Sequence, residues 1–286
     1  MKILFFITLF ISSLFGLSVD MSSSTISNGR TILVEFDREK DTKYEYIQID
    51  KKKYEVFPHP IDKKRVYALL PVSYYQKPSD KKVEVHYREQ GAEKSKSIFV
   101  RIEDGKYKKE TIKVQKSKVN LSKKDKKRAA KEYKEALDIY NTVTKKSYIS
   151  SKFIMPLESK ITSDFGKARV YNDTLKGYHS GTDFRAAVGT PLKACNDGVI
   201  VLAKDRFYAG GSVIIDHGHG IYTCYYHMSK FDVKEGQHVK KGELIGLSGD
   251  TGRVTGPHLH FSARVGGVQV DPLQLITLIN KNLLKK

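Results

Sequence analysis

The chain has 286 residues, of which 40% are hydrophobic, so it can bury one large core or two ordinary ones and is too apolar for wholesale disorder. Lysine and arginine number 51 against 32 aspartates and glutamates, which gives a formal charge of +19. This charge favours anionic partners, and two cysteines are too few for a disulfide framework.

Residues 1–18 have the pattern of an export signal. Met1-Lys2 is a positive start, residues 3–15 are largely apolar, and Gly16 and Ser18 are small residues before a cut after Ser18. The apolar run is short for a membrane span. We therefore expect an exported protein, most simply periplasmic, with the cell wall or the extracellular space as the alternative. An uncleaved signal that anchors the chain in the membrane is the alternative to cleavage after Ser18.

Export changes which anionic partner the charge predicts. In the cytosol such a charge would indicate nucleic acid, whereas outside it the anionic polymers are wall glycopeptides, teichoic acids and lipid headgroups. We therefore expect no nucleic-acid partner. Export also permits a disulfide between Cys195 and Cys224, and two unbonded thiols are the alternative.

Residues 19–105 alternate apolar and polar side chains in short runs, as in 32–36, 44–49, 83–87 and 98–102. Breaks rich in Asn, Gly, Asp, Pro and Lys separate the runs. Roughly six strands at this spacing predict a small antiparallel, β-sandwich-like domain. His59 and His86 are isolated within it and are expected to be ordinary strand or surface residues.

Residues 106–150 form a basic connection. Its first part, 106–118, is rich in lysine and reads as a linker or an edge strand. Ser122 and Asp125 then resemble a capping box, and apolar residues follow at helical spacing as far as Val143, which predicts a connecting α-helix of about six turns. We expect its apolar stripe, which includes Tyr133, to pack on a neighbouring domain. Binding of the helix to a membrane surface is the alternative.

Residues 151–276 change to short, glycine-separated strands, expected at 199–201, 212–215, 222–226, 244–247 and 258–265. A helical pattern follows at 272–284. This texture predicts a nearly all-β, antiparallel domain, with residues 277–286 as a basic C-terminal tail, and so a mainly β fold for the chain.

Seven of the nine histidines lie between positions 179 and 260. In extended chain His179 and Asp183 share a face, as do His258 and His260, because the side-chain period of a strand is two. Two imidazoles and one carboxylate suit Zn²⁺, and three protein ligands leave a fourth position for water, which favours a catalytic site over a structural one. Spacing leaves open which of His258 and His260 is the ligand.

A metal-dependent peptidase also needs groups that move protons. The chain has no His-Glu-x-x-His motif, so histidine must serve, and His227 offers the second such group. His217 and His219 are expected in a glycine-rich turn, and His238 at the start of a strand without a partner.

Residues 154–275 resemble the lysostaphin-type (LytM) family of peptidoglycan zinc metallopeptidases. The motifs that carry the resemblance are, in chain order, Asp164-Phe165-Gly166, His179-Ser180-Gly181-Thr182-Asp183-Phe184, Gly189-Thr190-Pro191-Leu192, Asp197-Gly198-Val199, Tyr226-His227-Met228-Ser229, Gly236-Gln237-His238-Val239, residues 251–261 with Gly256-Pro257-His258-Leu259-His260-Phe261, and Val270-Asp271-Pro272.

The resemblance implies that His179, Asp183 and His260 bind one Zn²⁺ and that His227 and His258 are the catalytic pair. Tyr171 is a candidate for the tyrosine that assists in relatives. Ser262 departs from the acidic residue that many relatives carry there, and Cys195 and Cys224 replace commoner small residues.

The expected function is then hydrolysis of peptide cross-links in peptidoglycan, at the bond from D-alanine to diaminopimelate or, alternatively, at glycine bridges. Because no wall-anchoring domain follows residue 276, we expect an enzyme that remodels its own cell's wall, with the balance of endopeptidase and carboxypeptidase activity open. A non-catalytic, wall-binding regulator of another hydrolase is the alternative. A further hypothesis is that the N-terminal region covers the active site until displaced.

Overall fold

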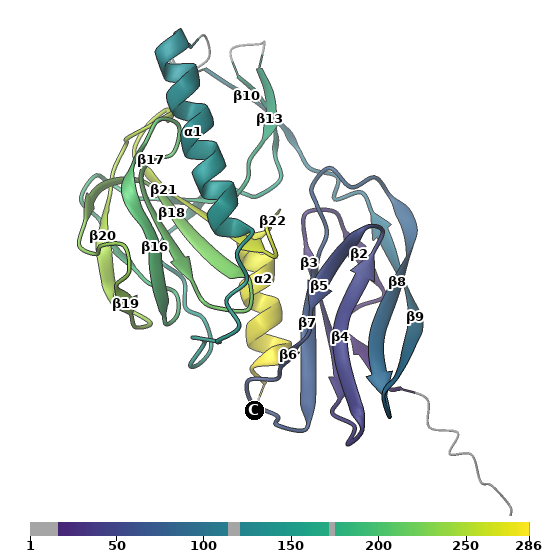
Figure 1. Ribbon diagram of the computed structural model, residues 1–286. Coiled ribbons are helices and arrows are strands. Elements are labelled where there is room, and N and C mark those ends of the chain that lie inside the picture. Colours follow the sequence, from purple (N-terminus) through teal and green to yellow (C-terminus); the bar gives the residue numbers. More distant parts are fainter. Residues whose placement is uncertain (1–16, 114–120, 172–174, 286) are drawn as a thin grey trace, which may run out of the picture.

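The computed structural model describes residues 17–113, 121–171 and 175–285 (Figure 1). Most of the expected export signal therefore lies outside the described residues. No helix within the described ranges is long and apolar enough to cross a bilayer.

The N-terminal part, up to Glu103, consists of two β-sheets that face each other, which confirms the expected sandwich-like domain. The first sheet has the order β1 (Val19–Met21), β3 (Thr31–Asp37), β7 (Arg65–Pro71) and β6 (Phe57–Pro58). The second has the order β2 (Thr25–Ser27), β9 (Ala92–Glu103), β8 (Ser79–Glu89), β4 (Thr42–Ile49) and β5 (Lys52–Glu55). Nine strands replace the expected six because β1, β2 and β6 are too short to show a periodicity.

The first sheet is buried on both faces. Ile32 and Val34 of β3 face the core of the sandwich, whereas Leu33 belongs to a second hydrophobic cluster with residues of the C-terminal half. Tyr67 and Leu69 of β7 join that second cluster. The run of three apolar residues at 32–34 is therefore the signature of a strand covered on both sides, as is usual for such runs.

The connection begins with a strand and continues as a helix. β10 (Lys109–Ile112) pairs in parallel with β12 (Ala168–Tyr171), and β12 pairs with β13 (Leu175–Tyr178). This basic segment was expected to be either a linker or an edge strand, and the structure shows an edge strand.

Helix α1 (Lys123–Tyr140) begins as expected, because the Ser122 hydroxyl accepts a hydrogen bond from the Asp125 N–H at 3.1 Å. Ala136 and Tyr140 are buried against the C-terminal sheet, which confirms that the helix packs on a neighbouring domain (Figure 1). The helix ends at residue 140, short of the expected six turns, and the assignment of Tyr133 to the packed stripe was wrong, since it is 62% exposed.

The C-terminal half is built on a ten-stranded, antiparallel sheet, which confirms the expected nearly all-β architecture. Its main path is β11 (Ile161–Ser163), β14 (Thr182–Arg185), β21 (His258–Val265), β18 (Ile221–Phe231), β17 (Gly210–Asp216), β16 (Gly198–Arg206) and β19 (His238–Val239). Three further strands pair onto this path: β15 (Pro191–Lys193), β20 (Leu244–Ser248) and β22 (Val268–Val270).

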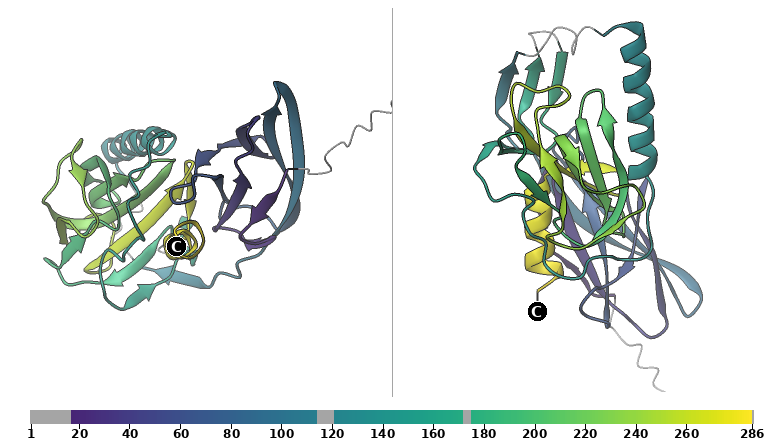
Figure 2. Two further views of the ribbon diagram at one scale, coloured as in Figure 1. Left: turned by 90° about the horizontal axis from the view of Figure 1, so that it is seen from below. Right: turned by 90° about the vertical axis from the view of Figure 1, so that its left-hand side faces the viewer.

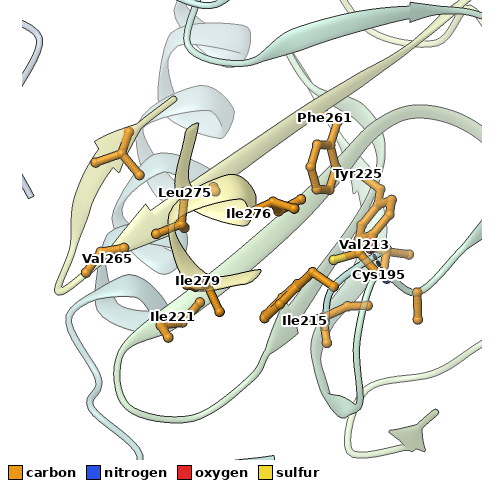
Figure 3. Packing of buried hydrophobic residues seen from close by; sticks show 14 of the residues in the cluster. Cys195, Val213, Ile215, Ile221, Tyr225, Phe261, Val265, Leu275, Ile276 and Ile279 are labelled. Atoms are coloured by element: carbon orange, nitrogen blue, oxygen red, sulfur yellow. Dashed lines mark hydrogen bonds between the residues drawn. The ribbon is translucent and has the colours of Figure 1, made fainter. Parts of the chain in front are cut away.

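Helix α2 (Pro272–Leu278) runs directly into a π-helix at Ile279–Leu283. A basic tail at 277–286 was the wrong expectation, because Ile279, Leu283 and Leu284 are buried in the main core. Figure 3 shows Leu275, Ile276 and Ile279 packed with residues of the sheet such as Tyr225 and Phe261. The lysines of this segment suggested a polar tail, but its apolar residues recur at helical spacing and form one buried face.

Helix α2 lies between the two halves of the molecule, as seen end-on in Figure 2. The amide of Gln274 forms two hydrogen bonds with the backbone of Thr31, at 3.0 and 2.9 Å. The Tyr67 hydroxyl lies 2.8 Å from Nδ1 of His219, whose ring stacks on Phe57. Leu33, Phe57, Tyr67 and Leu69 of the sandwich also belong to the hydrophobic cluster of the C-terminal half, so polar and apolar contacts both join the two parts.

Candidate metal and catalytic site

The pairing of two strands brings the main site residues together. In the register of β14 with β21, Asp183 lies opposite His260, and residues opposite each other in a ladder point to the same face. His258 shares that face because it is two residues from His260 on β21. His179 lies in the short segment between β13 and β14.

Asp183 stands at the centre of the cluster. Its Oδ1 is 2.8 Å from His179 Nε2 and 2.9 Å from His260 Nδ1, and these two nitrogens are 3.0 Å apart. All three side chains are buried, and the atoms they offer lie within 4.8 Å of one another. Two imidazole nitrogens and a carboxylate oxygen in this arrangement form a donor set that fits a divalent metal ion.

Hydrogen bonds to the backbone orient three of the histidines. Nδ1 of His179 lies 2.7 Å from the carbonyl oxygen of Asp164, Nδ1 of His227 lies 2.7 Å from that of Thr251, and Nδ1 of His258 lies 2.8 Å from that of Gly256. A carbonyl oxygen only accepts, so each Nδ1 carries the proton. Each Nε2 is then the nitrogen that is free of the backbone, where it can bind a metal or exchange a proton.

His227 and His258 stand together beside the three-residue cluster. Their ring centroids are 4.8 Å apart, and His258 Nε2 lies 3.7 Å from Asp183 Oδ1. His227 is also 6.0 Å, between centroids, from the ring of His260. All five residues singled out in the sequence are therefore in one place.

Burial and neighbouring groups shift the pKa values of three residues in the cluster. Burial opposes ionisation of Asp183, but the hydrogen bonds with His179 and His260 outweigh it and hold the pKa of this carboxyl well below its usual range. Burial lowers the pKa of His260 to about 4. Burial, with the neighbouring His258 and His260, lowers the pKa of His227 well below the usual value. Asp183 is therefore ionised, and His227 and His260 are neutral, near neutral pH.

Two grooves flank the cluster. One is lined by residues 110–113 of the connection, by Thr162 and Ser163, and by 255–258. The other is lined by Tyr178, Ser180, Tyr208, Arg253 and the rings of His227 and His260. The cluster thus borders both grooves, since Asp183 and His258 line the first, and His179, His227 and His260 line the second.

Arg169 lines both grooves and was missed in the sequence. Its guanidinium donates a hydrogen bond to Asp183 Oδ2 at 3.2 Å. No pattern marks it, because one arginine among 51 basic residues becomes distinctive only when β12 places it next to Asp183. The side chain of Tyr171, the other residue considered on this strand, lies outside the described ones.

The remaining histidines stand apart from the cluster. His217 and His219 lie at the turn between β17 and β18, as expected, and their rings are buried. His238 makes an edge contact with the ring of Tyr148. Cys195 and Cys224 are both free, buried thiols, which is the alternative to the disulfide.

Residues 177–272 match peptidase family M23. This part of the chain is an M23 peptidase domain. The expected family resemblance is thereby confirmed, and the M23 domain contains all five residues of the cluster.

Named relatives match over less than half of this chain. The chain is 46% identical over 122 residues to the peptidoglycan DD-endopeptidase ShyA of Vibrio cholerae, which covers 42% of this chain and 28% of that protein. It is 45% identical over 97 residues to the DD-carboxypeptidase/endopeptidase Mpg of Neisseria meningitidis, covering 34% and 22%. The chain thus spans less than a third of the length of these relatives.

A crystal structure of an M23 peptidase from Pseudomonas aeruginosa matches more of the chain. The TM-score is 0.65 at 27% identity, over 85% of this chain and 92% of that one. This likeness extends beyond the M23 domain into the N-terminal half.

Proposed function

We propose that this protein is an exported, periplasmic zinc endopeptidase that hydrolyses peptide cross-links of peptidoglycan. The observation that carries the proposal is the convergence of His179 Nε2, Asp183 Oδ1 and His260 Nδ1, with the imidazole rings of His227 and His258 beside them. An M23 domain and relatives named as peptidoglycan DD-endopeptidases support it.

His179, Asp183 and His260 would hold one Zn²⁺ per chain. Three protein ligands of the nitrogen and oxygen type are the set found at catalytic zinc sites, which keep one position open. When bound, zinc polarises a scissile carbonyl and lowers the pKa of water.

His227 and His258 would act as the catalytic pair. Each Nδ1 hydrogen-bonds to a backbone carbonyl oxygen, which leaves Nε2 as the nitrogen that can exchange a proton with the substrate or water. One imidazole takes a proton as the attacking water adds to the carbonyl, and the pair returns it to the leaving amine. With their ring centroids 4.8 Å apart, both can reach one substrate atom.

The bond that we assign joins D-alanine to diaminopimelate. The relatives' names, DD-endopeptidase for ShyA and DD-carboxypeptidase/endopeptidase for Mpg, support a D-alanine bond and leave trimming of terminal D-alanine as a second activity to test. Glycine bridges are the alternative substrate. A non-catalytic wall-binding role is disfavoured, because such proteins typically lose ligands and all five residues are present here.

The test is replacement of His258 by alanine. The variant should retain zinc, because His258 is outside the ligand set, and should lose about 10²- to 10⁴-fold in digestion of purified sacculi. His238→Ala, an exposed histidine outside the cluster, should leave both unchanged. Undiminished digestion by His258→Ala would overturn the assignment.

The bond itself is identified by the digestion products. Mass spectrometry of muropeptides from a diaminopimelate-type wall and from a glycine-bridged wall should show cleavage in the first and none in the second. Cleavage of the glycine-bridged wall alone would reverse the substrate assignment.

We also propose that the N-terminal region limits access to the cleft, and we assign this role to the connection. Ile112 and Lys113 lie on the groove beside His258. Replacing Ile112 by alanine removes side-chain atoms from this side of the groove. Ile112→Ala should therefore raise the turnover of soluble muropeptides without changing the zinc content. Equal turnover would end the proposal.

A further inference from the structure

The two oxygens of Asp183 have different partners. Oδ1 lies within 2.9 Å of the facing nitrogens of His179 and His260. Oδ2 instead accepts a hydrogen bond from Nη2 of Arg169 at 3.2 Å. The guanidinium thus occupies one edge of the carboxylate and leaves the other edge to the metal ligands.

Arg169 is itself held in place from the opposite side. Its Nε donates to Glu110 Oε2 at 3.1 Å, and Glu110 lies directly opposite Arg169 in the register of β10 with β12. Nη2 also donates to the hydroxyl of Ser163 at 3.1 Å, and that hydroxyl lies 3.2 Å from Nδ1 of His179. The side chains of Arg169 and Asp183 are 13% and 10% exposed, so water competes little for these contacts.

From this chain of contacts we propose that Arg169 and Glu110 are positioning residues for the metal site. Arg169 fixes the carboxylate of Asp183 so that Oδ1 alone faces the metal position. Glu110 fixes Arg169 from the connection, and both residues lie outside 177–272, the residues that match family M23. Partners that orient a ligand typically change metal affinity by about 10- to 100-fold when removed.

The guanidinium of Arg169 also has an electrostatic effect on metal affinity, which opposes the effect of orienting Asp183. Its positive charge repels a dication, so its removal would by itself strengthen binding of the metal. Because orientation and repulsion act in opposite directions, the sign of the change in zinc affinity tells which of them dominates. The proposal requires that orientation dominates.

The experiment uses the full chain and measures the dissociation constant for Zn²⁺ by competition with a chelator. We expect Arg169→Gln to bind Zn²⁺ about 10- to 100-fold more weakly and Glu110→Gln to weaken it less. Arg169→Lys should recover part of the loss, since an ammonium restores one donor but not the fork. The double variant should bind no more weakly than Arg169→Gln, because both changes break one chain of contacts.

Arg101→Gln is the matched control, since Arg101 forms a similar pair with Asp80 on the outer sheet of the sandwich. The visible spectrum of the Co²⁺-substituted protein gives a second readout, which should change in Arg169→Gln and remain unchanged in the control. Circular dichroism of the metal-free variants identifies any that fail to fold, and Glu110→Gln then carries the test.

Zinc binding by Arg169→Gln that is equal to or tighter than in the parent chain would overturn the inference. A rise in KM for muropeptides with unchanged zinc affinity would do so too, because Arg169 would then be a contact for a substrate carboxylate. The inference rests on the proposed zinc site. Failure of the parent chain to bind Zn²⁺ would refute that site, whereas failure in the variants alone refutes only the positioning role.

Discussion

His227 reaches the site through an exception to strand geometry. On β18 Tyr225 faces the core and Tyr226 pairs with His260, so strict alternation would turn the next residue back toward the core. His227 instead has a φ of 63°, and the pairing of β18 with β20 shifts register just beyond it. Left-handed backbone at a non-glycine residue is costly and concentrates at functional sites. Periodicity could not have predicted this placement; the family resemblance indicated it.

Gly181 is required by the close approach of His260. A Cβ at position 181 would lie 2.4 Å from the carbonyl oxygen of Phe261 and 2.6 Å from His260 Nε2. Gly181→Ala should therefore displace His260, weaken zinc binding and lower the free energy of unfolding by about 1–3 kcal/mol. Chelator competition and urea denaturation measure the two effects. Gly256→Ala is the control, because a Cβ there would meet nothing within 4 Å. Equal losses in the two variants would contradict the steric argument.

Among the elements, helix α1 shows what a local pattern can and cannot predict. Its start could be predicted because capping by Ser122 involves only neighbouring residues. Which apolar residues it buries depends on the surface it meets. Ala136 and Tyr140 pack against Leu202 and Tyr222, whereas Tyr133 extends into solvent. Five of the ten strands of the C-terminal sheet (β16, β17, β18, β20 and β21) were predictable for the same reason as the cap, because their glycine-rich turns are local.

Two tyrosines on this helix should therefore differ in their effect on stability. Tyr140 is 2% exposed, and its hydroxyl hydrogen-bonds with that of Tyr226 at 2.8 Å. Tyr140→Ala should lower the free energy of unfolding by about 3–5 kcal/mol, the range for truncating a buried aromatic ring. Tyr133→Ala should change it by no more than about 0.5 kcal/mol. Urea denaturation of both variants decides, and similar losses would mean that α1 is docked in another orientation in solution.

At the scale of the whole molecule, the domain boundaries expected from the sequence cut through a single hydrophobic core. Leu33 and Tyr67 from the sandwich belong to one hydrophobic cluster with Ile276 and Leu283 near the C-terminus. These residues come from segments far apart in the sequence, so no local pattern reveals the contact. Removing residues 19–146 to test for autoinhibition would expose this apolar surface, and a single change such as Ile112→Ala is the cleaner experiment.

The pH dependence of stability should depend on His217. This ring is fully buried, with Nδ1 2.7 Å from the carbonyl oxygen of Asp197 and Nε2 2.8 Å from the hydroxyl of Thr223. Burial lowers its pKa from 6.5 to about 4. Above pH 6.5 neither the folded nor the unfolded chain protonates it, so it contributes no slope. Below pH 6.5 the unfolded chain takes up the proton first, and the folded state is destabilised until about pH 4.

Between pH 6.5 and pH 4 we expect the free energy of unfolding to fall by about 3 kcal/mol. Each unit by which folding lowers the pKa of His217 corresponds to about 1.36 kcal/mol. His217→Gln keeps hydrogen-bonding groups but cannot titrate, so its free energy of unfolding should fall less over that interval, although it is lower at pH 7. Urea denaturation of both chains with excess chelator excludes any effect of metal release, and the difference between the two curves cancels the other titrating groups. Parallel curves from pH 7 to pH 4 would show that His217 is protonated equally in the folded and unfolded chains, and its burial would then have to be transient.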